Sequence, residues 1–176
     1  DQRKRLRTPG AFPNMSDTPC LRVRRRKVAN VFKGDPWIYP NACLDPLPAA
    51  GVAQVRTDDG QALGWVDVNP RAPIPGRLLT RSDDWPGDEV WLAAGIERAI
   101  ARRERLGYQL AGGAVRLINN EGDGLPGLAV DAYGRHLVVD IGTRGMAERL
   151  PLIRDILGRV CPDSRMQARI SEDAAR

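Results

Sequence analysis

The stretch GVAQVRTDDGQALGWVDVNP, residues 51–70, decides the fold class of this 176-residue chain. Asp59 and Gly60 separate two runs in which apolar and polar residues alternate, VAQVRT (52–57) and QALGWVDV (61–68). An Asp-Gly pair between alternating runs is a strong local signal for an antiparallel hairpin. We therefore predict a β-hairpin here and, around it, a small antiparallel barrel or sandwich.

The region before the hairpin extends this β-rich half. The segment LRVRRRKVANVFKG (21–34) begins with alternating apolar and basic residues, which predicts a half-buried strand with a basic outer face. The segment GDPWIYPNACLDPLPAAG (34–51) is dense in proline and predicts turns. Trp37 and Tyr39 flank Ile38 there, and we interpret the two aromatic residues as core anchors, with stacking on an unpaired base as the alternative.

Beyond residue 76 the hydrophobic period changes. The segment 77–107 contains a helical stripe that ends before Gly107, and it is made of Leu92, Ile96, Ala99, Ile100 and Leu106. We expect this amphipathic helix to join two domains. In the remaining chain we predict three strands, at AVRLI (114–118), LAVDA (128–132) and HLVVDIG (136–142). A helix follows at MAERLPLIRDILGRV (146–160), with Met146, Leu150, Ile153 and Leu157 facing the core, and then a last strand at RMQARI (165–170). The fold class is thus α+β, with a small β-barrel followed by a small α/β domain of β-β-β-α-β order.

The composition limits the classes of function. A hydrophobic share of 42% supports a real core, and neither a membrane-spanning run nor a secretory leader is present, so we expect a cytoplasmic protein. The net charge is +5, but residues 1–33 alone carry ten basic and two acidic side chains. Basic character concentrated at one end favours a polyanion such as RNA as the partner, with a solvated surface strand as the alternative.

The residues that usually carry catalysis are scarce. Cys20, Cys43 and Cys161 are scattered and His136 is the only histidine, so no metal-ligand spacing exists and we expect no metal. The loop carboxylates Glu121, Asp123, Asp131 and Asp140 lack an evident partner for acid–base chemistry. We interpret them as turn-forming or solvated groups.

Three glycines at G-x-G-x-x-G spacing, Gly122, Gly124 and Gly127, suggest a nucleotide loop. Such a loop must lead from a strand into a helix, because the helix N-terminus binds the phosphate. Here the glycines lead into an alternating, strand-like segment, Pro126 removes one N–H group, and two carboxylates stand beside the supposed phosphate site. We therefore predict a turn and no cofactor-binding residues.

Three motifs, in order along the chain, resemble one family. RRRKVANVFKGDPWIYPNA (24–42), VNPRAPIPGRLLTR (68–81) and RLINNEGDGLPGLAVDAYG (116–134) are similar to segments of the RlmI-type bacterial 23S rRNA cytosine-C5 methyltransferases. The second motif retains Asn69, Pro70, Ile74 and Arg77. Asp35 and Ala72 depart from the histidine and serine that are usual in that family.

The resemblance covers the chain from about residue 20 onward. Together with the residue patterns it predicts a PUA-like RNA-binding domain (20–86), a connecting helix (87–109) and a small α/β domain (110–176), preceded by an arm (1–19) that we expect to be flexible because its start has little apolar content and no periodicity. The family continues into a class I domain that binds S-adenosylmethionine and carries a catalytic cysteine. We expect that domain to lie beyond residue 176, and so expect no catalytic residue and no S-adenosylmethionine site within this segment.

The expected partner is RNA, ribosomal by the resemblance, with a homodimer left open and no membrane involved. We predict an RNA-binding set that combines the basic run, an aromatic residue and the arginine of the second motif: Arg22, Arg24, Arg25, Arg26, Lys27, Lys33, Trp37 and Arg77. Two alternatives remain at this point, a stand-alone PUA-type or ribosome-associated adaptor without enzymatic activity, and a protein-interaction module that offers an exposed strand edge.

Overall fold

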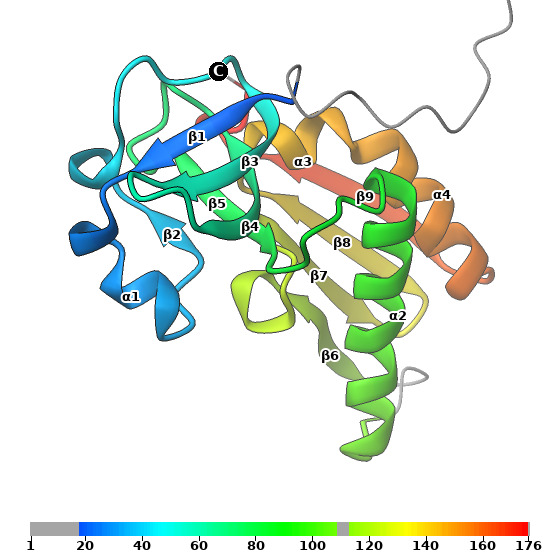
Figure 1. Cartoon of the computed structure of the whole chain (residues 1–176). Helices are drawn as coiled ribbons and strands as arrows, with labels where there is room; N and C mark the ends of the chain where they lie inside the picture. The colour runs from blue at the N-terminus through cyan, green and yellow to red at the C-terminus, as the bar shows by residue number, and fades with distance from the viewer. Residues whose placement is uncertain (1–17, 109–112, 176) are drawn as a thin grey trace, which may run out of the picture.

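The computed structural model describes residues 18–108 and 113–175, and these form two sheets that lie side by side (Figure 1). Residues 1–17 of the expected flexible arm lie outside the described residues. The first sheet has the order β1-β3-β4-β5-β2 and the second the order β6-β7-β8-β9. Their strands are β1 Cys20–Val23, β2 Trp37–Ile38, β3 Gly51–Thr57, β4 Ala62–Val68, β5 Gly76–Thr80, β6 Ala114–Asn119, β7 Leu128–Tyr133, β8 His136–Ile141 and β9 Arg165–Ile170.

The predicted hairpin is confirmed as β3 and β4, which pair antiparallel with a turn at residues 58–61. Gly60 has a φ of +90° in that turn. A glycine is also required at position 64 on β4, because a Cβ there would overlap the carbonyl oxygen of Thr80 on the neighbouring strand β5. The two strands therefore approach closely, and the first sheet curls into the barrel-like half of the α+β fold.

The half-buried strand predicted at the start of the basic segment is confirmed as β1. The chain then turns through the 3₁₀ turn η1 (Arg25–Lys27) and the one-turn helix α1 (Ala29–Phe32). The strand ends there because the alternation stops after Val23. The next buried residues, Val28 and Val31, are three apart, which is a helical spacing.

Helix α2 (Asp88–Arg105) confirms the predicted amphipathic helix. Its buried side chains, which include Trp91, Leu92 and Ile96, belong to the core of the second sheet. Leu106 was expected on the same stripe, but it follows the last helical residue and is 65% exposed. The helix therefore connects the two sheets in sequence while it packs on one face of the second.

The second sheet confirms the β-β-β-α-β order. Strand β9 pairs parallel with β8, and the chain between them forms α3 (Arg144–Glu148) and α4 (Leu150–Val160). The single helix predicted over 146–160 is thus broken at Arg149, because the ring of Pro151 and its missing N–H do not fit a helix interior. Met146, Ile153 and Leu157 are buried as expected, whereas Leu150 is only half-buried.

The glycine-rich segment forms a turn, as predicted. The 3₁₀ turn η3 (Asn120–Asp123) ends at Gly124, which has a left-handed φ of +71°, and the chain then enters β7. A Cβ on Gly127, whose φ is +83°, would overlap the side chain of Thr143. The glycines therefore allow tight turns and close packing, and they do not open a helix that would bind a phosphate.

Two hydrophobic cores correspond to the two sheets. One gathers the inward side chains of the first sheet and α1, and the other lies between the second sheet and helices α2, α3 and α4. The expected domain limits at residues 20, 87 and 110 stay a prediction. Among the described residues, no helix combines the length and the apolar character needed to cross a membrane.

Candidate nucleic-acid interface

Four cations of the predicted set are exposed and make no ion pair among the described residues. Arg22 lies on β1, Arg26 and Lys27 on η1, and Lys33 directly after α1. They come from one short stretch at the end of the first sheet that is remote from the second sheet (Figure 1). Exposed, unpaired cations of this kind are free to neutralise a polyanion.

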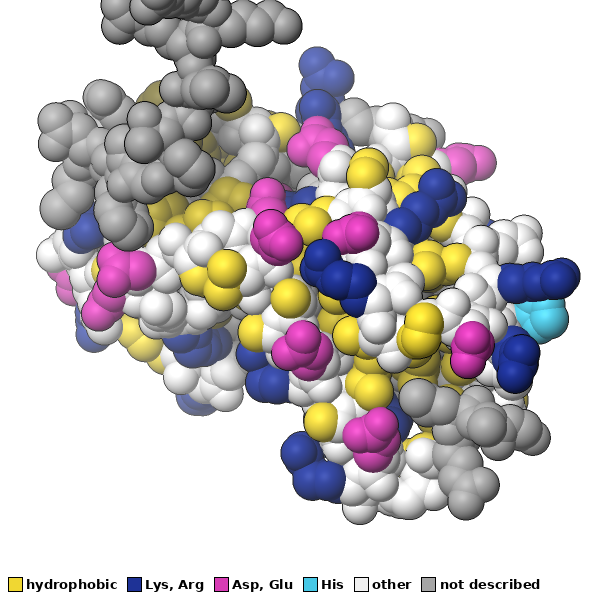
Figure 2. Space-filling view, turned by 90° about the vertical axis from the view of Figure 1, so that its right-hand side faces the viewer, with side chains coloured by type: hydrophobic (Ala, Val, Ile, Leu, Met, Phe, Trp, Pro, Cys, Tyr) yellow, Lys and Arg dark blue, Asp and Glu magenta, His cyan; other side chains and the backbone are white. Residues whose placement is uncertain are grey.

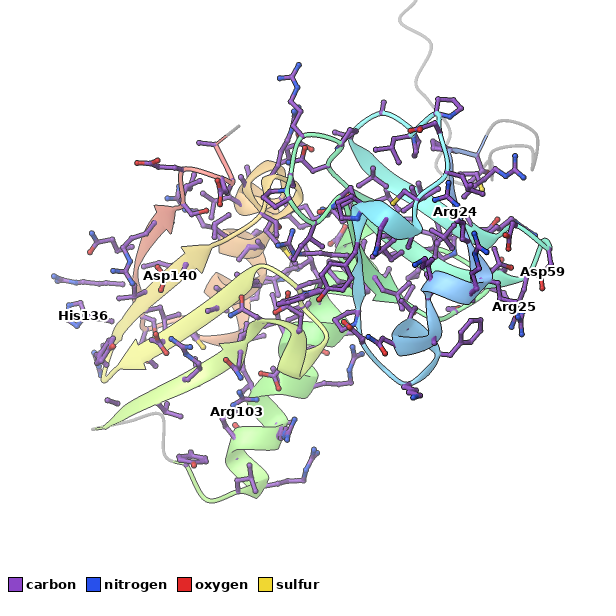
Figure 3. The ribbon with its side chains drawn as sticks, turned by 90° about the vertical axis from the view of Figure 1, so that its left-hand side faces the viewer. Arg24, Arg25, Asp59, Arg103, His136 and Asp140 are labelled. Carbon is purple, nitrogen blue, oxygen red and sulfur yellow. The ribbon has the colours of Figure 1, made fainter. Side chains whose placement is uncertain are left out.

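Two further arginines of the set already have partners. Arg24 donates from Nη1 to the carbonyl oxygen of Cys43 at 2.7 Å, which ties β1 to the turn after η2 (Pro40–Ala42). Arg25 contacts Asp59 in the hairpin turn at 3.2 Å and lies over the ring of Phe32 (Figure 3). Because the Arg25 pair is half exposed, it is weak and available for exchange with another anion. These two residues therefore shape the basic surface more than they add free charge to it.

The aromatic residues of the proline-rich segment are largely exposed. Trp37 is 36% exposed, Tyr39 is 41% exposed, and Ile38 between them is fully buried. The two rings meet edge to face with centroids 6.3 Å apart. The prediction that Trp37 and Tyr39 are core anchors is wrong, because their alternation with Ile38 on a strand directs both rings away from the core. Their exposed ring faces are available for stacking.

Arg77 joins Trp37 on one face of the first sheet. The two residues are direct partners across the antiparallel pair β2 and β5. Glu121 of η3 reaches this pair from the second half of the chain: its Oε1 accepts a hydrogen bond from Trp37 Nε1 at 3.0 Å and lies 3.8 Å from Arg77 Nε. Trp37, Arg77 and Glu121, which we call the seam cluster, each come from a different one of the three sequence motifs.

Sequence reasoning missed Glu121 as a member of this cluster. It was interpreted as a turn-forming loop carboxylate, and it stands 84 residues from Trp37, so no local spacing signals the contact. Arg77 remains incompletely paired, since its Nε is buried without a hydrogen-bond partner. A buried donor that lacks an acceptor is costly, so this nitrogen marks a point where the cluster is incomplete.

A second cluster between the two halves is fully paired. Arg149, at the break between α3 and α4, donates from Nε to Asp88 at 2.7 Å and lies 3.4 Å from Asp67 of β4. The Arg149 side chain is only 8% exposed and packs over the ring of Trp91. Burial raises the pKa of Asp67, although Arg149 opposes that shift. We call Asp67, Asp88 and Arg149 the buried hub, and no sequence signal pointed to it.

The other carboxylates singled out in the sequence are held by arginines. Burial by itself would raise the pKa of Asp123, but hydrogen bonds from Arg103 and from the Asn119 amide outweigh it and lower the pKa. The Arg116 guanidinium binds Asp131 through two hydrogen bonds and lowers its pKa. The interpretation of Asp131 and Asp140 as turn-forming or solvated groups is wrong, because they lie on β7 and β8 and are ion-paired.

The pair of Asp140 and Arg169 completes the charge pairs on the open face of the second sheet, again through two hydrogen bonds. His136 is exposed at the start of β8, and Figure 3 shows His136 and Asp140 on the side of the molecule opposite Arg24 and Arg25. On the α2 and α4 side, acidic and basic side chains are mixed without a large region of one sign (Figure 2). Unpaired positive charge in one compact stretch is thus a feature of the first sheet.

The three cysteines are free thiols, and burial raises the pKa of each. A raised pKa disfavours the thiolate, which is the nucleophilic form of cysteine. Within the residues that the structure describes, no group of three or more histidine, cysteine or acidic side chains is arranged to hold a metal ion.

Comparison with known proteins places this geometry in context. A family model described as a PUA-like domain matches residues 21–81, which contain the first sheet and most of the basic and aromatic surface. A curated relative from Deinococcus radiodurans, named ribosomal RNA large subunit methyltransferase, is 31% identical over 91% of this chain and 41% of its own length. A relative from Alteromonas mediterranea, named ribosomal RNA large subunit methyltransferase I, is 28% identical over 92% of this chain and 41% of its own length.

Solved structures share the fold as well. A putative SAM-dependent methyltransferase from Streptococcus mutans superposes with a TM-score of 0.75 at 17% identity, over 86% of this chain and 40% of that protein. At this level of identity the likeness concerns the fold alone. The chain spans about two fifths of the length of the relatives that it matches.

Proposed function

We propose that this chain is the RNA-binding, substrate-recognition part of a ribosomal RNA large subunit methyltransferase. The PUA-like match and the similarity to proteins of that name support the proposal. The target we infer is 23S ribosomal RNA, modified at C5 of a cytosine. The observation that carries the proposal is that the PUA-like half has four exposed, unpaired cations and also two partly exposed aromatic rings.

The chemistry of RNA explains why this surface suits it. Arg22, Arg26, Lys27 and Lys33 can each displace a counterion from a phosphate, which supplies affinity without choosing a sequence. Trp37 and Tyr39 offer ring faces on which unpaired bases stack, as single-stranded RNA segments allow. Cations and exposed rings on the same half of the chain favour RNA over an acidic protein as the partner.

We infer that methyl transfer itself depends on a region outside the matched part of the relatives. Attack at C6 of cytosine requires an activated thiolate, and burial raises the pKa of Cys20, Cys43 and Cys161 instead of lowering it. Residues 1–176 are accordingly proposed to position the RNA and to hold neither the methyl donor nor the nucleophile.

The experiment compares two variants that each lose four exposed, unpaired cations. The test variant changes Arg22, Arg26, Lys27 and Lys33 to glutamine. The matched control also introduces glutamine, at Arg98 and Arg105 of α2, Arg135 of the β7–β8 turn and Arg154 of α4. Binding to a 23S rRNA fragment is measured by fluorescence anisotropy at several salt concentrations. We expect the test variant to lose about three units of the slope of log K against log salt, at roughly 0.7–0.9 per contact.

The control variant has the same net charge, so it should retain the wild-type slope if binding is local to the PUA-like half. Equal losses in the two variants would contradict the proposal, because they would mean that only net charge matters. Absence of binding by the wild-type chain at low salt would contradict it as well.

A further inference from the structure

A cavity of about 260 Å³ opens beside the seam cluster, between the first sheet and the start of α3. Arg77 and the loop that follows β4 line this cavity. Both belong to the second sequence motif, which therefore forms a large part of the cavity wall. Its size is near the lower limit of small-molecule sites, enough for one aromatic heterocycle but not for a folded helix. The apolar walls come from Ala72, Pro73 and Ile74.

The charged groups of the cavity are not all available to a ligand. Asp67 is engaged by Arg149 of the buried hub, and Arg144 binds Glu148 at 2.9 Å. Arg77 donates no hydrogen bond within the described part of the chain and contacts Glu121 only at 3.8 Å. The exposed carboxylate of Asp173 has no partner there either. The cavity therefore holds one cation with only a long contact to Glu121 and one exposed carboxylate without a partner among the described residues.

The presence of Arg77 and Asp173 in one cavity limits the class of ligand that it can bind. A phosphate would meet the carboxylates of Asp67 and Asp173, so an anion is disfavoured. A neutral ring that carries a hydrogen-bond acceptor next to an exocyclic amine would satisfy Arg77 and Asp173 together, while the apolar walls contact its faces. Cytosine, adenine and guanine have such an edge, whereas uracil lacks the amine.

We propose that this cavity binds one unpaired, amine-bearing nucleobase of the bound RNA, with its acceptor at Arg77 and its amine at Asp173. The inference rests on the proposed function and adds a base-selective element to the otherwise sequence-independent basic surface. Trp37 does not line the cavity but is the cross-strand neighbour of Arg77 and is 36% exposed, so we infer that it stacks on an adjacent nucleotide. The Glu121 carboxylate orients the indole through its hydrogen bond to Nε1.

The test uses three labelled RNA heptamers and the full chain. One is all uridine, one has a central cytidine, and one has a central 2-pyrimidinone nucleoside, which is cytidine without its amine. We expect the cytidine heptamer to bind about tenfold more tightly than all-uridine, as one well-matched base contact allows, and the 2-pyrimidinone heptamer to bind like uridine.

Variants assign the preference to the cavity. Asp173→Ala, which removes the acceptor at an exposed position that tolerates change, should abolish the tenfold preference, and Arg77→Gln should reduce it. Arg71→Gln removes a charge from the same loop but not from the cavity wall, so it should keep the preference with a small uniform loss of affinity.

The outcomes separate the two proposals. If the heptamers bind equally well to the wild-type chain, or if Asp173→Ala keeps the preference, the cavity assignment is wrong while RNA binding stands. If no heptamer and no rRNA fragment binds at low salt, the proposed function fails and the cavity assignment fails with it.

Discussion

The buried hub and the seam cluster both join the two sheets through an arginine, yet they differ in how completely that arginine is paired. Arg149 is 8% exposed, contacts two carboxylates and packs on Trp91. Arg77 is 23% exposed, lies 3.8 Å from its one carboxylate and keeps a buried Nε without a partner. A fully paired buried charge holds a fold together, whereas an incompletely paired one leaves an interaction for a ligand.

The largest expected effect is on the free energy of unfolding. Arg149→Met should lower it by about 3–5 kcal/mol, because the substitution leaves the buried Asp67 carboxylate without its cation. The same change at Arg77 should cost less than about 1 kcal/mol, since its ion pair is long and partly exposed. Urea denaturation followed by circular dichroism measures both.

These two variants test whether Arg77 and Arg149 have different roles. If Arg77→Met destabilises the protein as much as Arg149→Met, the seam cluster is structural and the distinction between the two arginines is wrong.

A smaller effect sharpens the role of the hub. A Cβ at Gly145 would overlap the Asp67 carboxylate, so Gly145→Ala should push β4 away from α3 and lower the free energy of unfolding by about 1–3 kcal/mol. Gly158 lies within α4 and has nothing within 4 Å of its ideal Cβ. Gly158→Ala should therefore stabilise the protein by about 0.5–1 kcal/mol. Thermal melts of the two variants should shift in opposite directions, and a stabilising Gly145→Ala would show that Asp67 is not held tightly.

Local patterns predicted the elements well. The Asp59-Gly60 hairpin, the helix around Ile96 and the last strand follow from short-range periodicity and turn residues, and the structure confirms them. The helix predicted from Met146 onward is wrong in its start, because Pro151 divides it into α3 and α4. This boundary depends on a single local residue and not on a distant contact.

The candidate site was only partly predictable, for a different physical reason. The basic run and Trp37 stand out in the sequence because charge and aromatic residues are local features. The contacts of Arg77 with Glu121, and of Arg149 with Asp67, join residues that only the fold brings together. Whether Arg77 and Arg149 can bind another group depends on how deeply each is buried, and burial is a property of the folded chain.

The most direct test of the central claim is to identify the residues that touch RNA. Ultraviolet cross-linking of the wild-type chain to a 23S rRNA fragment that contains 4-thiouridine, followed by peptide mass spectrometry, gives that answer. The account predicts cross-links within residues 22–39, with Trp37 and Tyr39 among them. Cross-links confined to α2, α4 and the open face of the second sheet would contradict it.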